Sequence, residues 1–552
     1  KTPLLFLAFL FSFPLAYSQT TPQQTEQIAT FCQVWGFLKY YHPVVAKGGL
    51  DWDAEFMTRV KTLPTGKSKQ EISNYYLDWI DHLGKVKDCA SCTSNVPESL
   101  AYNLDLAWLS DSTVFTPNLI NQFRYIQRNR NRGKNQYVQQ YKAVGNTNYD
   151  QEKPYVDSIF PSPELRLLAL SRYWNIINYF FPYKYRTDQP WNMVLPEMIP
   201  KFKDAPDTIA YHLAMLELTV KTNDYHAVFV THYTNQYFGS KWAPFRFKLI
   251  DNKAIVTGFY DDSLCLLNDI QKGDVFLTVN NKTIEELIKT QSRYIGASNE
   301  AARLRNAFMA IFNGQTDSVN TTFEREGKVF NKTVYRYFFK QFTPPSPAKD
   351  NQDPSQILEG NIGYVNLGLL QPNQVDEVLE QMKHTRAIIF DVRNYPKGTM
   401  YKIADFLNAA ERPFVKFSKP DMDYPGVFQY TDIMSCGHHN EHPYPGKVVL
   451  LFNERTQSHA EFTLMALQTA PRVISIGSQT AGADGNVSEI VFPGNYKVHM
   501  TGIGVYYPDG RETQRIGIVP DITVKPTIAG LQAGKDEVLA KALEYLENLE
   551  RP

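Results

Sequence analysis

The sequence lacks an excess of one charge, a dense set of cysteines and, beyond its first residues, any long apolar stretch. Its 57 basic and 57 acidic residues cancel, so the charge favours neither a nucleic acid nor an anionic membrane as partner. Five cysteines in 552 residues exclude a disulfide scaffold, and no later stretch is apolar enough to span a membrane. What remains is a globular composition, 43% hydrophobic and 13% aromatic, in a chain long enough for roughly three or four domains.

The first 18 residues have the pattern of a secretory signal peptide. An apolar run from Leu4 to Ala16 ends in Ala16-Tyr17-Ser18, a small-residue pattern typical of a cleavage site. The run is too short to cross a bilayer as a stable helix, and no cysteine follows it that could carry a lipid anchor. We therefore expect residues 1–18 to be removed and the rest to be exported, to a periplasm or outside the cell, without stable membrane insertion. In an exported protein, Cys89 and Cys92 are expected to form a local disulfide rather than to bind zinc.

A degenerate internal duplication marks the N-terminal part. The segment from Trp35 to Pro43 is echoed by that from Trp174 to Pro182, and another Trp follows each copy at the same distance. Apolar residues at helical spacing, ended by a proline, predict two helical hairpins. We assign residues 19–155 to the first repeat with its connector and residues 156–240 to the second.

Only the second copy has a histidine after its last helix. It contains Asn223-Asp224-Tyr225-His226, whereas the first contains Lys87-Asp88-Cys89 at the matching place. The Asp is echoed and the His is not, which indicates a special task for His226. The alternative is a histidine packed beside Tyr225.

Residues 241–345 change to short β-type runs. The segment from Ile270 to Lys282 contains a Gly-Asp turn, a strand and an Asn-Asn turn, and a helix follows from Ile284. This segment resembles that of a PDZ domain, a module that binds extended peptides or C-termini by strand addition. The resemblance implies that a polypeptide substrate docks on this PDZ-like module.

Residues 350–552 alternate strands and helices, which predicts an α/β core. Within it, the buried strand Lys447–Phe452 and the helix Phe462–Leu467 flank Ser458. A serine at such a turn lies beside the free N–H groups of a helix N-terminus, which can stabilise an oxyanion, so the position suits a nucleophile. The alternative is that Ser458 or Thr456 only caps the helix.

Three segments of this core resemble the C-terminal processing, or tail-specific, serine protease family. They are Asp391-Val392-Arg393-Asn394-Tyr395-Pro396-Lys397-Gly398, Ser458-His459-Ala460-Glu461, and the stretch from Tyr507-Pro508-Asp509-Gly510 to Val519-Pro520-Asp521-Ile522. Their order and spacing agree with the family across about residues 240–545. The resemblance implies a multidomain α/β fold with a helical N-terminal region, a PDZ-like β-rich module and a ClpP/crotonase-like catalytic core. It also implies polypeptide substrates and no cofactor.

The resemblance further implies which groups carry the chemistry. Ser458 is the expected nucleophile, but Ala483 stands where Ser–Lys members of the family have their lysine, so a dyad of that type is excluded. The tricorn-like (retinoid-binding-protein-like) branch takes its base from a histidine ahead of the PDZ-like module, which corresponds here to His226. Where this branch has a glutamate, the chain has Gln514, which can fix a tautomer but cannot offset an imidazolium charge. Asp224 is the other candidate for orienting the imidazole.

The oxyanion hole is expected from the backbone N–H groups of His459 and Gly398. Lys397 replaces the first glycine of the family pattern and adds a cation near the site. It could attract a substrate carboxylate, act as an unorthodox base, or be a solvated loop residue.

One further cluster, Cys436 to His442, contains soft ligands at close spacing. No ligand set of standard spacing completes it, so we expect a polar loop and no metal. The sequence thus predicts an exported serine endopeptidase. The rival is a catalytically inactive binder of peptides or apolar ligands on the same scaffold, for which the departures from the family pattern leave room.

Overall fold

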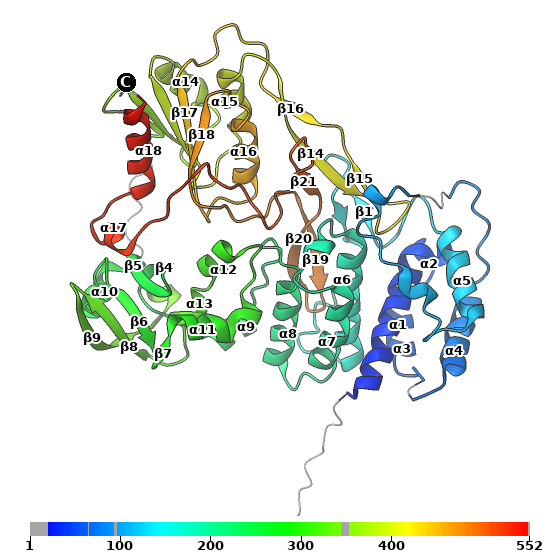
Figure 1. Ribbon diagram of the computed structural model, residues 1–552. Helices are drawn as coiled ribbons and strands as arrows, with labels where there is room; N and C mark the ends of the chain where they lie inside the picture. Colours follow the sequence, from blue (N-terminus) through cyan, green and yellow to red (C-terminus); the bar gives the residue numbers. More distant parts are fainter. Residues whose placement is uncertain (1–19, 65, 93–95, 344–352, 550–552) are drawn as a thin grey trace, which may run out of the picture.

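The computed structural model describes residues 20–64, 66–92, 96–343 and 353–549 (Figure 1). The predicted signal peptide, residues 1–18, lies outside these ranges. A helical region, a β-rich unit and an α/β core follow one another along the chain, coloured from blue through green to red in Figure 1. The predicted fold class, a multidomain α/β protein with a helical N-terminal region, is confirmed. Within the described ranges, no helix is both long and apolar enough to cross a membrane.

The two copies of the N-terminal repeat form the same contact. Trp35 Nε1 donates to the carbonyl of Trp52 at 3.1 Å, and Trp52 Nε1 donates to that of Trp35 at 3.2 Å. Trp174 and Trp191 exchange the same pair of bonds at 2.9 and 3.0 Å, so the repeated sequence pattern corresponds to a repeated packing arrangement. The α-helices of the region are α1 (Pro22–Tyr41), α2 (Pro43–Ala46), α3 (Trp52–Arg59), α4 (Lys69–His82), α5 (Pro117–Arg128), α6 (Pro163–Phe180), α7 (Trp191–Lys203), α8 (Thr208–Val220) and α9 (His232–Phe238).

One hydrophobic core serves both repeats and also receives residues from far along the chain. The hairpin of β19 (Val487–Phe492) and β20 (Tyr496–Thr501) lies beside α6 in Figure 1. The ring of Phe492, in β19, stacks on the ring of Tyr173, in α6, and the two ring centroids lie 5.3 Å apart. The hairpin residues buried in this core are Ile490, Phe492, Val498 and Met500. The predicted division at residue 155 therefore does not separate two cores, because the apolar faces of both repeats are buried together.

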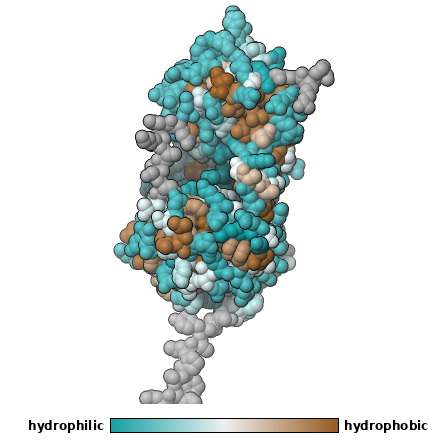
Figure 2. Space-filling model, turned by 90° about the vertical axis from the view of Figure 1, so that its left-hand side faces the viewer, coloured by the Kyte–Doolittle hydropathy of each residue, from teal (hydrophilic) through white to brown (hydrophobic). Residues whose placement is uncertain are grey.

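The β-rich unit, residues 241–343, is built on a sheet of strand order β4-β5-β6-β8-β9. Asn280 and Asn281, with φ of 49° and 61°, form the predicted Asn-Asn turn between β6 and β7, since a two-residue hairpin turn needs positive φ. Figure 2 shows the side of the molecule on which both this unit and the core are exposed, and its apolar residues form separate patches. Its strands are β3 (Lys241–Trp242), β4 (Phe245–Ile250), β5 (Lys253–Phe259), β6 (Val275–Val279), β7 (Lys282–Thr283), β8 (Ser318–Arg325), β9 (Lys328–Tyr335) and β10 (Tyr337–Phe338). Its α-helices are α10 (Asp262–Leu267), α11 (Ile284–Gln291), α12 (Glu300–Asn306) and α13 (Met309–Phe312).

The α/β core has the strand order β11-β12-β13-β17-β18-β22, parallel except for β11. Ile388 and Phe390 face α14, α15 and α16, whereas Ala387 and Ile389 face α18. Burial on both faces explains why these strands are continuous apolar runs in the sequence. The elements are β11 (Ser355–Leu358), β12 (Ile362–Asn366), β13 (Ala387–Asp391), β17 (Lys447–Phe452), β18 (Val473–Gly477), β22 (Ile522–Thr523), α14 (Val375–Met382), α15 (Met400–Leu407), α16 (His459–Leu467), α17 (Ile528–Gln532) and α18 (Glu537–Asn548). Because β13 and β17 are parallel neighbours, the loop after Asp391 lies next to the turn before Ser458.

A second, smaller sheet fastens the core to the helical region. In it, β14 (Arg412–Pro420) pairs with β15 (Phe428–Tyr430), β16 (Met434–Cys436) and β21 (Gly504–Tyr506). The N–H of Val505 in β21 donates to the hydroxyl of Tyr183 at 2.5 Å, and the N–H of Gly426 donates to the carbonyl of Tyr179 at 3.0 Å. Residues of the core are thereby held against the helices that precede His226.

Candidate active site

Ser458 stands at the sharp turn between β17 and α16. It is the N-cap residue of α16, as the capping alternative also requires, but its φ of 55° and ψ of −124° differ from the extended backbone of an ordinary N-cap. A residue with a side chain is strained at this φ, and such strain is a feature of nucleophiles at strand-to-helix turns. The N–H of Ser458 donates to the carbonyl of Ala483 at 2.9 Å and to Glu461 Oε2 at 3.1 Å, and these bonds hold the backbone in place.

A buried carboxylate, that of Glu461, organises the surroundings of Ser458. It also accepts hydrogen bonds from the N–H groups of Gly482 at 2.8 Å and Ala483 at 3.0 Å, and from the hydroxyl of Thr480. Burial raises the pKa of Glu461, and these donors offset part of the rise. Glu461 thus ties the first turn of α16 to residues 480–483. In the sequence, Glu461 is marked by the capping-box spacing, three residues after Ser458, and by its place in the family-like segment Ser458 to Glu461.

His226 and Asp224, which follow α8, meet Thr501 at the end of β20. His226 Nδ1 lies 2.8 Å from Thr501 Oγ1 and 3.6 Å from Asp224 Oδ1. Thr501 Oγ1 donates to Asp224 Oδ1 at 3.0 Å, and the Thr501 N–H donates to Asp224 Oδ2 at 2.6 Å. Because the hydroxyl has one proton and gives it to the carboxylate, it must accept from His226 Nδ1–H, which leaves the lone pair on Nε2. The imidazole therefore has the tautomer of a general base at Nε2.

Asp224 is the charged member of this group and is only 2% exposed. Burial opposes its ionisation, but hydrogen bonding and charge from His226, together with the Thr501 N–H, lower its pKa below the ordinary value. Gln514, also buried, donates through Nε2 to Asp224 Oδ1 at 3.4 Å and so supports the carboxylate rather than the imidazole. Glu512, the carboxylate two residues before Gln514, lies outside this group and accepts from Arg186 Nε at 2.6 Å.

Arg305 of α12 connects the two halves of the candidate site. Its guanidinium donates to the carbonyl of Glu454 at 2.7 Å and to Gln457 Oε1 at 3.1 Å, in the turn before Ser458. The same group lies 4.4 Å from the ring centroid of Tyr225, next to His226. In the part of the chain that the structure describes, the Ser458 hydroxyl forms no hydrogen bond with His226. Hydrogen bonds between catalytic groups are often poorly aligned in a free enzyme and form only when a ligand binds.

The predicted oxyanion donors are on the loop after β13 and at the start of α16. Among the described residues, the N–H groups of Gly398 and His459 have no acceptor, so both are available to a ligand. Gly398 has φ 76°, a conformation that favours glycine. The loop is held by Asp391, which accepts from Arg393 Nη2 at 2.6 Å. Lys397 is exposed, as the solvated-loop alternative requires.

The sequence singled out two other clusters, the loop from Cys436 to His442 and the cysteines. Within the described ranges, no group of three or more His, Cys, Asp or Glu residues could hold a metal ion. His438 of the predicted polar loop lies 3.0 Å from Asp405. Cys89 and Cys92 form a disulfide, as expected. The free cysteines, all buried, are Cys32, Cys265 and Cys436.

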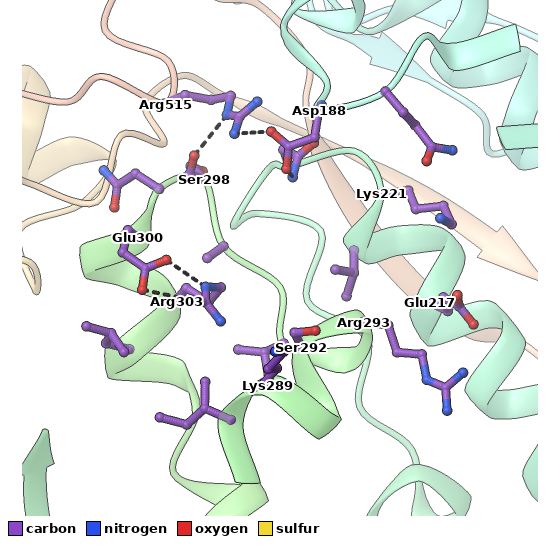
Figure 3. A pocket seen from close by; sticks show the side chains of 18 of the residues that line it. Asp188, Glu217, Lys221, Lys289, Ser292, Arg293, Ser298, Glu300, Arg303 and Arg515 are labelled. Atoms are coloured by element: carbon purple, nitrogen blue, oxygen red, sulfur yellow. Dashed lines mark hydrogen bonds and ion pairs between the residues drawn. The ribbon is translucent and has the colours of Figure 1, made fainter. Parts of the chain in front are cut away.

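A cleft of about 840 Å³ opens beside the His226 loop, between the end of α8 and the helices α11 and α12 (Figure 3). Arg515 crosses it to Asp188 at 2.6 Å and donates to the carbonyl of Ser298 at 3.1 Å. The hydroxyl of Ser298 in turn accepts from the N–H of Tyr225 at 2.9 Å. The cleft therefore borders the turn that leads to His226: its lining includes Asn223 and Ser298, but not His226 or Ser458.

Comparisons with known proteins agree with this architecture. Residues 361–524 match the model of the family described as Peptidase family S41. The structure of mature CPAF resembles this chain with a TM-score of 0.55 at 15% identity, covering 71% of this chain and 99% of that one. Mature CPAF complexed with lactacystin gives 0.54 at 14% identity, with 70% and 98% covered. The photosystem II D1 C-terminal processing protease gives 0.36 at 16% identity, with 68% and 98% covered. No curated protein matches the sequence. At these identities, the likeness to CPAF shows a shared fold.

Proposed function

We propose that this chain, which belongs to peptidase family S41 of tail-specific proteases, is an exported serine endopeptidase that cuts polypeptides. The observation that carries the proposal is the hydrogen-bonded group of Asp224, Thr501 and His226, which leaves a free lone pair on the imidazole. A protein that only binds its ligand does not need an imidazole held in one tautomer against a buried carboxylate. The strained backbone of Ser458 supports the same conclusion.

In the proposed reaction, His226 Nε2 takes the proton of the Ser458 hydroxyl while Oγ attacks the carbonyl carbon of the scissile bond. The carbonyl oxygen becomes an oxyanion that accepts from the N–H groups of His459 and Gly398. The imidazolium gives its proton to the leaving amine as the C–N bond breaks, and an acyl-enzyme remains. Water, deprotonated by the same imidazole, then attacks the acyl carbon, releases the carboxylic product and restores Ser458. Asp224 stabilises the imidazolium through Thr501.

Export is part of the proposal. It is supported by the apolar run from Leu4 to Ala16 and by the disulfide of Cys89 and Cys92, a bond that persists in oxidising compartments. A mature protein that begins after Ser18 and is recovered outside the cytoplasm is the expected result of fractionation and N-terminal sequencing.

Paired variants test the catalytic assignment. Ser458→Ala is expected to abolish peptide hydrolysis and labelling by a fluorophosphonate, and His226→Gln is expected to slow hydrolysis on the order of 10⁴-fold. The matched controls are Ser435→Ala on β16 and His438→Ala on an exposed loop, and both are expected to retain activity. Hydrolysis and labelling that survive in Ser458→Ala would refute the proposal and favour the binding protein.

A further inference from the structure

The free edge of the sheet in the β-rich unit is where a peptide would add as a strand. The strand order puts β4 at one end of the sheet and β9 at the other. Figure 1 places β9 on the side away from the core, whereas Lys248 of β4 pairs with Glu454, in the turn before Ser458, at 2.8 Å. A peptide captured for cleavage would therefore be expected at β4.

The chain itself fills the space beside β4. Residues 292–313, between α11 and β8, form α12 and α13, of which α12 contacts β4 and α13 contacts α11. The ring of Phe312 in α13 lies 5.0 Å from that of Phe245 and 4.9 Å from that of Phe247, both on β4. Ala307 and Ile311 are buried in the same core. The two short helices thus pack on β4 and α11, the elements that would border the peptide in a strand-addition module.

The backbone groups that lead into β4 are also occupied. The N–H of Lys241 donates to the carbonyl of Gly314 at 3.2 Å, and the N–H of Gly314 donates to that of Lys241 at 3.1 Å. On its other side, β3 pairs with β10. Pro244, the last residue before β4, has no N–H. The bonds of Lys241 and the pairing of β3 with β10 therefore hold this loop to the chain itself, where a peptide-binding module would offer N–H groups to a C-terminal carboxylate.

The helix α12 is at the same time a wall of the candidate active site. Ala302 is fully buried together with Ala481, and Asn299 Nδ2 donates to the carbonyl of Thr480 at 2.8 Å. Both contacts reach the segment 480–483, which Glu461 ties to Ser458. With the bonds of Arg305, these contacts make α12 a support of the nucleophile turn, so a peptide that displaced α12 would remove that support.

From these contacts we infer that α12 and α13 take the place of a bound peptide at the β4 edge, and that the protease selects internal segments of polypeptides without reading a free C-terminal carboxylate. The inference rests on the proposed function and narrows its substrate class. It also replaces the docking mode expected from the PDZ-like sequence, since the partner of the β4 edge is the chain's own insertion.

Two fluorogenic peptides that differ only in a C-terminal acid or amide test the inference. The kcat/KM values of the wild-type protein for the two peptides are expected to agree within about twofold. Binding of the two peptides to the Ser458→Ala variant, measured by fluorescence anisotropy, is expected to be equally strong or to be absent for both. A preference for the free acid of about tenfold or more in either measurement would overturn the inference. Failure of wild type to cut either peptide would instead count against the proposed function, and the binding measurement would still decide the question of the carboxylate.

The Arg305→Ala variant tests whether α12 stays in place or is moved by a bound substrate. The kcat/KM is expected to fall by about tenfold or more, by the same factor for both peptides, because the turn before Ser458 loses two hydrogen bonds. Added guanidinium is expected to restore part of the rate in this variant. The matched control is Arg124→Ala on α5, an exposed arginine that donates to Ser110 Oγ at 3.1 Å and whose loss is expected to have little effect. A rate that rises in Arg305→Ala, or falls only for the free acid, would show that a substrate tail moves α12 and would overturn the inference.

Discussion

The hydroxyl of Thr501 offers a quantitative test of how His226 is held. Thr501→Val keeps the shape of the side chain and the backbone N–H that binds Asp224 at 2.6 Å. It removes the oxygen that accepts from His226 Nδ1 at 2.8 Å and the proton donated to Asp224 at 3.0 Å. A hydrogen bond with a charged partner contributes about 1.5–3 kcal/mol, and the imidazole is charged in the transition state. We therefore expect kcat/KM to fall about 10- to 150-fold with KM little changed.

The assay follows kcat/KM with a peptide substrate, the second-order rate of fluorophosphonate labelling at Ser458, and Tm. Thr501→Ser keeps the hydroxyl and is expected to remain within about threefold of wild type. A folded Thr501→Val protein with wild-type rates in both reactions would refute the role of Thr501. His226 would then be oriented by some other group during the reaction.

Glu461→Gln is expected to slow labelling of Ser458 by about tenfold or more and to lower Tm, because its NH₂ group would face the N–H donors that now bind the carboxylate. The control is Glu441→Gln at an exposed position. An unchanged labelling rate in Glu461→Gln would contradict this role. Burial and the nearby charge of Glu461 raise the pKa of Asp484 well above its ordinary value, so the folded protein keeps a proton that the unfolded chain loses near pH 4. The free energy of unfolding therefore declines as pH rises above about 4, and Asp484→Asn is expected to raise Tm more at pH 8 than at pH 4, whereas equal shifts would speak against a buried neutral carboxyl. Replacing both Cys89 and Cys92 with Ser is expected to lower the free energy of unfolding by at most about 2 kcal/mol, because the disulfide closes a very short loop, and to leave activity unchanged. A loss of hydrolysis at unchanged Tm would be inconsistent with a purely local role.

Sequence reasoning succeeded for local structure that is determined by residues close together in the sequence. The strand Lys447–Phe452 has the predicted bounds, because a strand buried on both faces must be apolar throughout. The Asn-Asn turn at residues 280–281 was predictable for a similar reason, since asparagine tolerates positive φ. Asp224, His226 and Gln514 were all named as candidates, and the structure brings them together.

The parts that were not predictable depend on which distant surfaces meet. Thr501 ends an ordinary alternating strand, and nothing around it indicates a contact with a histidine 275 positions away. The segment 292–313 contains apolar residues at helical spacing, but its sequence does not say that Phe312 would pack against β4. The PDZ-like sequence pattern does not indicate what packs against β4, because packing partners are chosen by the whole fold.

The β19–β20 hairpin also sets the order in which the protein can mature. The helical region leaves the ribosome first, with an apolar surface that later residues of the chain cover: Ile490, Phe492, Val498 and Met500 of the hairpin, and Tyr424, Val427 and Tyr506. Until the hairpin arrives, that surface is open to aggregation or to a chaperone. His226 likewise has no Thr501 to fix its tautomer before the last part of the chain is made. Docking of the β19–β20 hairpin therefore both completes the core and supplies Thr501 to His226. A nascent chain, or one truncated before the hairpin, would have an unoriented histidine and is expected to be inactive.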